Sequence, residues 1–340
     1  MPESLHKAAL FLIGRAAGVF LSPGSVFSAA SLFSALVIAF ASLAWTRLRR
    51  GKAVKVRAMA RALFPRRLLR SPSSWADMGM FLFNTFPAAA LIGWAIASAS
   101  QISRPTAHLL SLAFGGAPLA GAPAGMARLA ATLALFLAYE FAYWLDHFLS
   151  HKIPAFWEFH KVHHTAEVLT PLTVFRVHPI DSLLFANITA AVMGLVGGVL
   201  EYAFGGSAAP FALSGTNIIL VAFAFLTVHL QHSHIWISFR GPIGRILMSP
   251  AHHQIHHSAD PGHFNRNLGS CLSIWDWAFG TLHIPGRKRE ALSFGAEPAK
   301  GAAAPHSVTG MLLTPFAQAS KHLPPAPRRR PIGAIEAALD

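Results

Sequence analysis

Histidine is concentrated in one part of this sequence, at spacings that suit metal binding. Fifteen of the 19 histidines lie between His147 and His283. The segments DHFLSH, FHKVHH and HHQIHH contain i, i+4 or i, i+3, i+4 spacings, which place side chains on one face of a helix. The members at these spacings are His147 and His151; His160, His163 and His164; and His253, His256 and His257. Each cluster can therefore direct its imidazoles at one point.

The donor type limits the metals that could bind. Imidazole suits iron, zinc, copper and nickel, whereas magnesium and calcium prefer oxygen ligands. Eight convergent histidines exceed the four ligands of one structural zinc ion, so the pattern favours two metals. The segment HLQHSH adds His229, His232 and His234, and His252 extends the last cluster.

The composition indicates a membrane protein. The chain has 340 residues, of which 53% are hydrophobic and 12% are charged, whereas soluble domains carry about a quarter charged residues. Five apolar stretches approach the ~20 residues of a spanning helix. They cover approximately residues 26–45, 78–97, 129–145, 183–202 and 212–228. Residues 7–22 form another apolar segment, which either spans weakly or lies at the membrane surface. We expect an all-α bundle of about four to five spanning helices, with a cytosolic helical cap that holds the histidines.

The distribution of charge predicts the orientation. Residues 47–70 hold ten basic residues and no acid, so the positive-inside rule places the loop 46–77 in the cytoplasm. The connection 101–126 is then outside, and the histidine clusters lie at the cytoplasmic face. The net charge of +14 reflects this topology and contact with anionic lipid head groups, rather than nucleic-acid binding. The Ala- and Arg-rich composition favours a bacterial inner membrane; in a eukaryote, the endoplasmic reticulum would be expected.

The membrane setting suggests a chemistry. A site at the bilayer face meets lipid chains, whose C–H bonds are unactivated. Zinc cannot oxidise such bonds, whereas an iron pair with O₂ can. The sequence has no dinucleotide-binding glycine motif after a strand and no c-type haem motif, so electrons must come from a separate ferredoxin, cytochrome or reductase. The single cysteine, Cys271, excludes an internal disulfide.

Several of these segments together resemble a known signature. YEFAYWLDHFLSHKIPAFWEFHKVHHT, FRVHPID, LQHSHI, SPAHHQIHHS and IWDWAFGT are similar, in this order, to the pattern of the sterol desaturase/fatty acid hydroxylase superfamily. The resemblance covers about residues 131–285. It implies an integral-membrane, non-haem di-iron enzyme that uses O₂ to hydroxylate or desaturate a lipid such as a sterol, a fatty acyl chain or an ether lipid. HPID and SPAHHQIHH resemble the hydroxylating branch, which favours hydroxylation.

The resemblance also implies particular site residues. The implied metal ligands are His147, His151, His160, His163, His164, His232, His253, His256 and His257. Further candidates close to the metals are His178, His229, His234, His252, Asp181, Asp276 and Glu140. The implied cofactor is two Fe ions, which zinc could replace during purification, and O₂ is the co-substrate.

The domain organisation and one alternative function complete the prediction. We expect an N-terminal membrane region over 1–130, a catalytic domain over 131–285 and a partly disordered tail over 286–340. The alternative is a non-catalytic zinc-binding membrane protein for metal storage, transport or structure. Transport would predict ionisable residues in mid-span, and Glu140 is the one such residue in the five apolar stretches.

Overall fold

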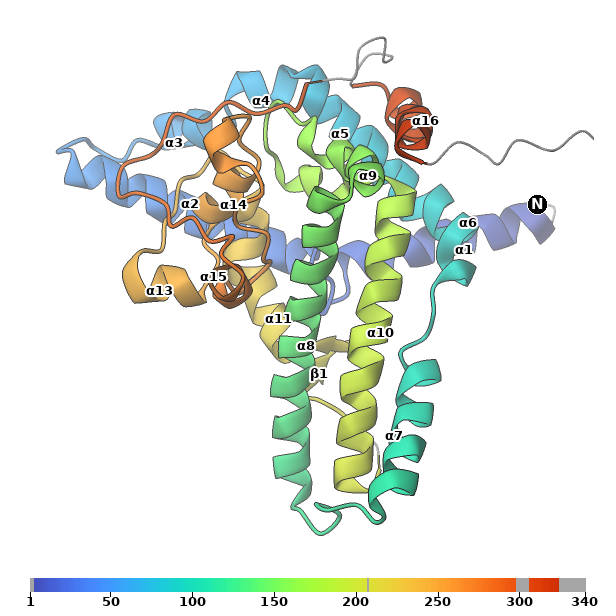
Figure 1. Cartoon of the computed structure of the whole chain (residues 1–340). Helices are drawn as coiled ribbons and strands as arrows, with labels where there is room; N and C mark the ends of the chain where they lie inside the picture. The colour runs from blue at the N-terminus through green and yellow to red at the C-terminus, as the bar shows by residue number, and fades with distance from the viewer. Residues whose placement is uncertain (1–2, 207, 298–305, 324–340) are drawn as a thin grey trace, which may run out of the picture.

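The fold is almost entirely helical (Figure 1). The computed structural model describes residues 3–206, 208–297 and 306–323. Within these ranges one two-stranded sheet is present, in which β1 (Ala212–Leu213) pairs antiparallel with β2 (Thr216–Asn217). The predicted all-α class is confirmed.

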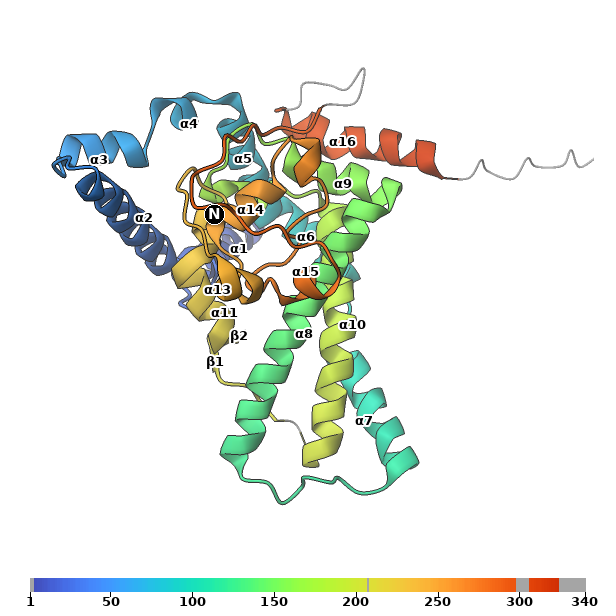
Figure 2. The same ribbon diagram turned by 60° about the vertical axis from the view of Figure 1, so that its left-hand side comes forward.

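The two longest helices, α8 (Ala124–Lys152) and α10 (Pro179–Phe204), stand side by side (Figures 1 and 2). Both are long and apolar enough to cross a membrane. Helix α10 begins at Pro179, where the missing N–H costs no intrahelical bond. It ends at Gly205, whose φ of 70° suits a residue without Cβ. The last turns of α8 and the first turn of α10 meet at one end of the bundle, and this end holds the histidines.

A helix that was not predicted, α7 (Ser100–Phe114), packs against α10 (Figure 1). Gly194 and Gly198 permit the contact, because a Cβ at Gly198 would lie 2.5 Å from Thr106 Cβ. Residues 101–114, which were expected to form part of an external connection, are therefore helical; their side of the membrane stays a prediction. Helix α7 has only 15 residues, so it does not appear in the sequence as a spanning-length apolar run.

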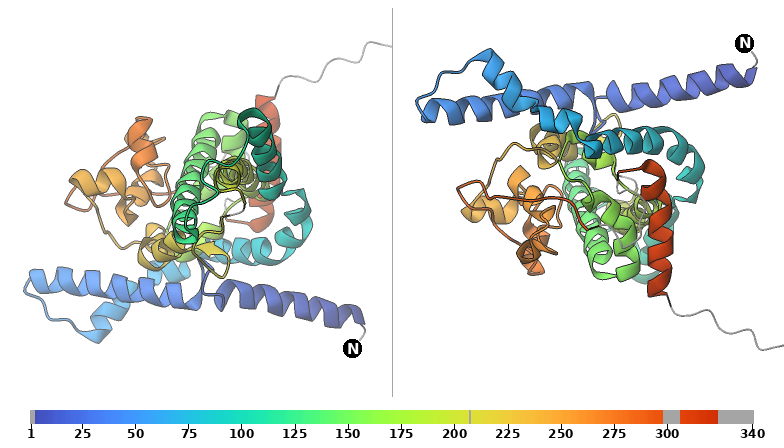
Figure 3. Two further views of the ribbon diagram at one scale, coloured as in Figure 1. Left: turned by 90° about the horizontal axis from the view of Figure 1, so that it is seen from below. Right: turned by 90° about the horizontal axis from the view of Figure 1, so that it is seen from above.

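Helices α1 (Glu3–Phe20) and α2 (Ala29–Arg49) follow one another across the molecule. Helix α2 is the third helix long and apolar enough to cross a membrane. In Figures 1 and 3, however, α1 and α2 run across the direction of α8 and α10 instead of alongside them. The helix predicted over 26–45 is present, but it does not extend a parallel bundle.

Two of the five predicted spans are not single helices. Residues 78–97 are divided among α5 (Pro72–Phe83), a π-helical turn (Asn84–Ala88), α6 (Ala89–Ile92) and a 3₁₀ turn (Gly93–Ala95). Pro87 inside the π turn has no N–H to donate, which explains the irregularity. Residues 212–228 begin in the β-hairpin and continue as α11 (Ile218–Phe223), a second π turn (Ala224–Val228) and α12 (His229–Gln231). Three helices in the described ranges meet the spanning criterion, fewer than the four to five expected.

The remaining helices lie at or beside the end of the bundle where α8 ends and α10 begins (Figures 1 and 2). They are α3 (Val56–Leu63), α4 (Arg66–Arg70), α9 (Pro154–His164), α13 (Gly241–Ile246), α14 (Pro250–His256), α15 (Ile274–Ala278) and α16 (Val308–Ala319), with 3₁₀ turns at Pro171–Phe175, Pro261–His263 and Ser320–His322. Helices α3 and α4 carry basic residues of the loop 46–77, so this loop and the histidines share one end of the molecule. The boundary expected at residue 130 falls inside α8. The tail residues 298–305 and 324–340, where disorder was expected, lie outside the described ranges.

Candidate metal centre

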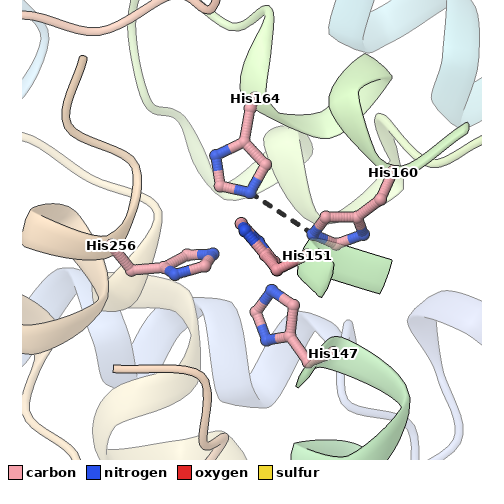
Figure 4. Close-up of side chains that lie close together, drawn as sticks. All are labelled: His147, His151, His160, His164 and His256. Atoms are coloured by element: carbon pink, nitrogen blue, oxygen red, sulfur yellow. Dashed lines mark hydrogen bonds between the residues drawn. The ribbon is translucent and has the colours of Figure 1, made fainter. Parts of the chain in front are cut away.

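Five histidines from three helices converge at the end of α8 (Figure 4). This five-histidine group consists of His147, His151, His160, His164 and His256. One ring nitrogen from each lies within 4.8 Å of those of the others. The last turns of α8 supply two of the histidines, α9 supplies two and α14 supplies one. The i, i+4 spacing on α8 and α9 aims each pair inward, as the sequence predicted.

Four more histidines form a second group beside the first. This four-histidine group consists of His163, His232, His253 and His257. Its Nε2 atoms face one another: the Nε2 atom of His232 lies 3.0 to 3.2 Å from the Nε2 atoms of the other three. The rings of His256 and His257, which belong to different groups, are centred 5.3 Å apart. The structure therefore sorts the nine predicted ligands into two adjacent groups.

The spacing within the four-histidine group suits a tetrahedral ion. Metal–nitrogen bonds of ~2.0–2.1 Å in tetrahedral geometry put the nitrogens about 3.3–3.4 Å apart. The rings would have to retreat by only a few tenths of an ångström, roughly. Hydrogen bonding alone cannot satisfy the cluster, because a neutral imidazole offers one proton or one lone pair at Nε2. A metal ion would satisfy all four nitrogens at once.

Burial favours the neutral form of eight of these imidazoles, which is the form that binds metal. Eight of the nine histidines are buried, and His151 is half-buried. Burial, reinforced by neighbouring histidines, lowers the pKa of His163, His164 and His257 well below the usual value. It lowers the pKa of His232 and of His256 to about 3. These five imidazoles therefore carry no positive charge near neutral pH.

Outer partners orient three rings of the five-histidine group. His147 Nδ1 donates to the Leu268 carbonyl at 2.7 Å, and His256 Nδ1 donates to the Arg266 carbonyl at 2.9 Å. A carbonyl can only accept, so these contacts fix the proton on Nδ1 and leave the lone pair on Nε2. The Nε2 atoms of His147, His151 and His256 are buried without a partner in the described part of the chain. These unpartnered acceptors fit a metal.

Asp181 provides the third outer partner. Its Oδ2 accepts the Nδ1 proton of His160 at 3.0 Å. The residue lies in the first turn of α10, where the helix dipole also favours a carboxylate. Asp181 is therefore close to the five-histidine group, as the sequence suggested.

The two other candidate acids act one step further away. The Asp276 carboxylate accepts the backbone N–H groups of Leu268 and Gly269, both at 2.8 Å. Glu140 accepts the backbone N–H groups of Cys271 and Leu272 at 2.8 and 2.7 Å. Neither acid contacts a histidine of the two groups; both hold the loop whose Leu268 carbonyl orients His147. Burial raises the pKa of Asp276, against the effect of these hydrogen bonds.

Four candidate histidines lie outside both groups. His178 caps α10: its Nδ1 accepts from the Ile180 N–H at 3.1 Å, and its Nε2 donates to the Leu312 carbonyl at 3.0 Å. Both of its nitrogens are therefore engaged away from the metals. His252 forms the capping box of α14 with Ser249.

The remaining two of these histidines serve the membrane region. His229 Nε2 lies 3.0 Å from the Ser31 hydroxyl of α2. His234 Nε2 donates to the Ala62 carbonyl at 2.7 Å. His229 thus joins the segment around His232 to α2, and His234 joins it to α3, so their roles are structural.

One acid that supports α9, Asp77, was not predicted from the sequence. Arg176 and Asp77 form a fully buried ion pair at 3.0 Å. The Arg176 Nε also donates to the Val162 carbonyl at 3.1 Å, beside His163. Buried pairs of this kind need full hydrogen bonding to be tolerated, and Thr173 supplies one more bond to Asp77 at 2.7 Å. A lone acid in the apolar segment WADMGMF was the available signal.

A cavity of about 490 Å³ opens beside the two groups. Its lining includes His147 and His160 of the first group and His163 and His232 of the second. The rest is largely apolar, and the aromatic residues are Phe27, Tyr139, Tyr143, Phe175 and Phe185. The volume lies within the range of small-molecule sites.

Comparison with known proteins defines the class. A model of the fatty acid hydroxylase family matches residues 132–281, a range that includes every histidine of the two groups. This part of the chain is similar to the fatty acid hydroxylase family, which supports the predicted resemblance to the sterol desaturase/fatty acid hydroxylase superfamily. The predicted resemblance is confirmed.

Individual relatives match over the same region. The chain is 31% identical over 149 residues to the ornithine lipid hydroxylase OlsE of Rhizobium tropici, covering 44% of this chain and 40% of the relative. It is 27% identical over 158 residues to the alkylglycerol monooxygenase of Danio rerio, covering 43% and 29%. It is 26% identical over 161 residues to the human alkylglycerol monooxygenase, covering 45% and 31%. The matches thus span less than half the length of these curated relatives. No solved structure matches the chain.

Proposed function

We propose that this protein is an integral-membrane, di-iron, O₂-dependent oxygenase that hydroxylates a lipid. The observation that carries the proposal is the pair of histidine groups, built from neutral imidazoles, that line one largely apolar cavity. In this proposal the nine histidines of the two groups are the metal ligands. Residues 131–285 form the catalytic domain, between the N-terminal membrane region and the C-terminal tail.

The apolar setting of the site favours iron over zinc. Imidazole ligands accept either metal, so the choice rests on the chemistry that the apolar cavity requires. An iron pair in the two groups would supply the O₂-dependent oxidation of an unactivated C–H bond. The protein's part is to hold nine imidazole donors, to orient three of them through Leu268, Arg266 and Asp181, and to exclude bulk water from the cavity.

The cavity is suited to a hydrocarbon chain. Tyr139, Tyr143 and Phe185 form edge-to-face pairs along one wall, with ring centroids 6.2 and 5.7 Å apart. Such rings offer an apolar surface that a hydrocarbon chain can contact. A methylene group of the substrate beside His147 and His163 would lie between the five-histidine group and the four-histidine group.

The relatives suggest the substrate class. One is named for an ornithine lipid and others for alkylglycerols, and both names describe chains joined to a polar head. We infer that this protein also acts on the chain of a polar membrane lipid. The words hydroxylase and monooxygenase in these names favour insertion of one oxygen atom over desaturation.

The orientation and the electron supply follow from charge. The basic helices α3 and α4 occupy the same end of the molecule as the histidines, so we place the metal centre at the cytoplasmic face, in a bacterial inner membrane. The same basic surface would contact anionic lipid heads and receive an acidic electron donor, such as a ferredoxin.

The test uses iron-loaded, chemically reduced protein in vesicles of a bacterial membrane lipid extract. We expect O₂ uptake and a lipid whose mass increases by one oxygen atom. The His256→Ala/His257→Ala variant, which alters both groups, should consume no O₂ above the vesicle background. A wild-type protein that binds two irons but oxidises no lipid would refute the proposal and favour the non-catalytic alternative. Loss of two hydrogens from the product would keep the oxygenase chemistry but replace hydroxylation by desaturation.

A further inference from the structure

A third set of metal-binding side chains lies outside the two histidine groups. It consists of His263, His283 and Glu290, and one donor atom from each lies within 4.8 Å of those of the others. His263 ends a 3₁₀ turn after α14, His283 follows α15, and Glu290 lies on the segment 282–297, which we call the strap. These residues are partly exposed, unlike the two buried groups.

The three side chains already face one another. The rings of His263 and His283 are centred 5.1 Å apart in an edge-to-face arrangement. His263 Nε2 lies 3.7 Å from Glu290 Oε2, which is longer than a good charge-assisted hydrogen bond. The His263 Nδ1 atom is buried and has no partner within the described ranges. Three donors that lie close together but pair poorly with one another suit a central ion.

Neighbouring backbone contacts hold two of the donors in place. The His283 N–H donates to the Asn267 side-chain oxygen at 2.7 Å. The Gly286 N–H donates to Glu290 Oε1 at 3.1 Å, which leaves Oε2 directed at His263. The donors thus have fixed backbones and need only small side-chain rotations to close on an ion.

We propose that His263, His283 and Glu290 bind a divalent cation of the zinc class, separate from the di-metal centre. Two imidazoles and one carboxylate form a set that zinc, cobalt and nickel accept, with water in the fourth position. The set carries one negative charge against the two positive charges of the ion. A cation close to the set on a neighbouring segment is Arg266, whose guanidinium donates to the Gly280 carbonyl at 2.9 Å.

The position of this site gives it a structural consequence. The strap runs on from Glu290 to pair with the segment after α14, where the Ala259 N–H donates to the Ser293 carbonyl at 2.9 Å. The Ala296 N–H then donates to the carbonyl of His164, a member of the five-histidine group, at 2.7 Å. An ion at the third site would hold the start of the strap in place. It would thereby stabilise the part of the strap that contacts His164 of the five-histidine group.

The first test counts metals. Full-length protein in detergent is equilibrated with buffered micromolar Zn²⁺, and total iron plus zinc per chain is measured by mass spectrometry. The wild type should hold one metal more than Glu290→Gln and one more than His283→Ala. Glu158→Gln is the matched control, because Glu158 faces His322 at the same 3.7 Å but belongs to no three-donor set among the described residues. Equal metal content in the wild type and in both variants would overturn the proposal.

The second test does not depend on counting. Arg287, Lys288 and Arg289 in the strap are exposed and are trypsin sites. Added Zn²⁺ should slow cleavage there at least severalfold in the wild type and not in Glu290→Gln. Zinc protection that persists in Glu290→Gln would show that the ion acts elsewhere. Because both tests compare proteins that retain the di-metal ligands, their outcome is independent of whether the centre oxidises lipid.

Discussion

Replacing Asp181 with asparagine should lower the affinity for one of the two metals and leave the affinity for the other unchanged. The carboxylate accepts the Nδ1 proton of His160, a member of the five-histidine group, at 3.0 Å, and no contact joins it to the four-histidine group. Asparagine keeps the shape and can still accept the bond, but it removes the charge that makes the imidazole a stronger donor. Loss of such outer partners reduces metal affinity by about 10–100-fold, or ~1.4–2.7 kcal/mol.

The assay is a chelator titration of iron-loaded protein at neutral pH, with iron retained per chain as the readout. The iron held by the five-histidine group should leave Asp181→Asn at a lower chelator concentration than it leaves the wild type. The iron held by the four-histidine group should leave both proteins at the same chelator concentration. Glu158→Gln on α9 is the control, because Glu158 pairs with Lys161 at 2.9 Å and with no histidine of the two groups. Equal weakening of both equivalents, or of neither, would refute the reasoning that Asp181 serves one group only.

Three further predictions concern the order of metal loss, acid stability and helix packing. In the wild type, the four-histidine group should lose its metal first, because the Nδ1 atoms of three of its histidines have no protein partner in the described ranges; a single release step would contradict this. Metal-free protein should lose stability as pH falls from about 6.5 towards 3, because the unfolded chain then binds protons that the folded chain excludes. The expected loss at pH 5 is about 2 kcal/mol for each of His232 and His256. A free energy of unfolding in detergent that does not change with pH would contradict this. Gly198→Ala should lower the melting temperature, because the new Cβ would collide with Thr106 at a cost of about 1–3 kcal/mol. Gly197→Ala is the control and should leave the melting temperature unchanged, because the nearest atom to a Cβ there is 3.6 Å away. Equal melting temperatures of the two variants would contradict the prediction.

The histidine sets could be predicted because their information is local. Spacings of three and four residues fix which side chains share a helix face, and the resemblance supplied His232 from a distant segment. The division into two groups could not be predicted in this way. Adjacent residues point in different directions on a helix, which is why His256 and His257 fall into different groups, but the partner of each depends on tertiary packing.

The outer partners were less accessible to sequence analysis. Leu268 and Arg266 act through backbone carbonyls, so their side-chain types carry no signal. Asp276 and Glu140 were recognised as candidates, yet they hold the loop instead of the rings. Asp181 was predicted because it is one of the few acids close in sequence to the histidine clusters.

The membrane region shows where apolarity alone misleads. Stretch length identified α8, α10 and α2, but it could not show that α2 runs across the bundle (Figure 3). It also missed α7, whose packing depends on Gly194 and Gly198 of α10. Small residues four apart in an apolar helix are typical of a close helix contact, so that pattern was the available clue.

The most direct test of the central claim is the metal content of two single variants. His256→Ala alters the five-histidine group, and the adjacent His257→Ala alters the four-histidine group. From iron-replete cells, the two-group account predicts about two metals in these groups for the wild type, about one for each variant and none for the double variant, after subtraction of any metal that depends on Glu290. Two metals retained in both single variants, or none in the wild type, would contradict a centre built from two histidine groups.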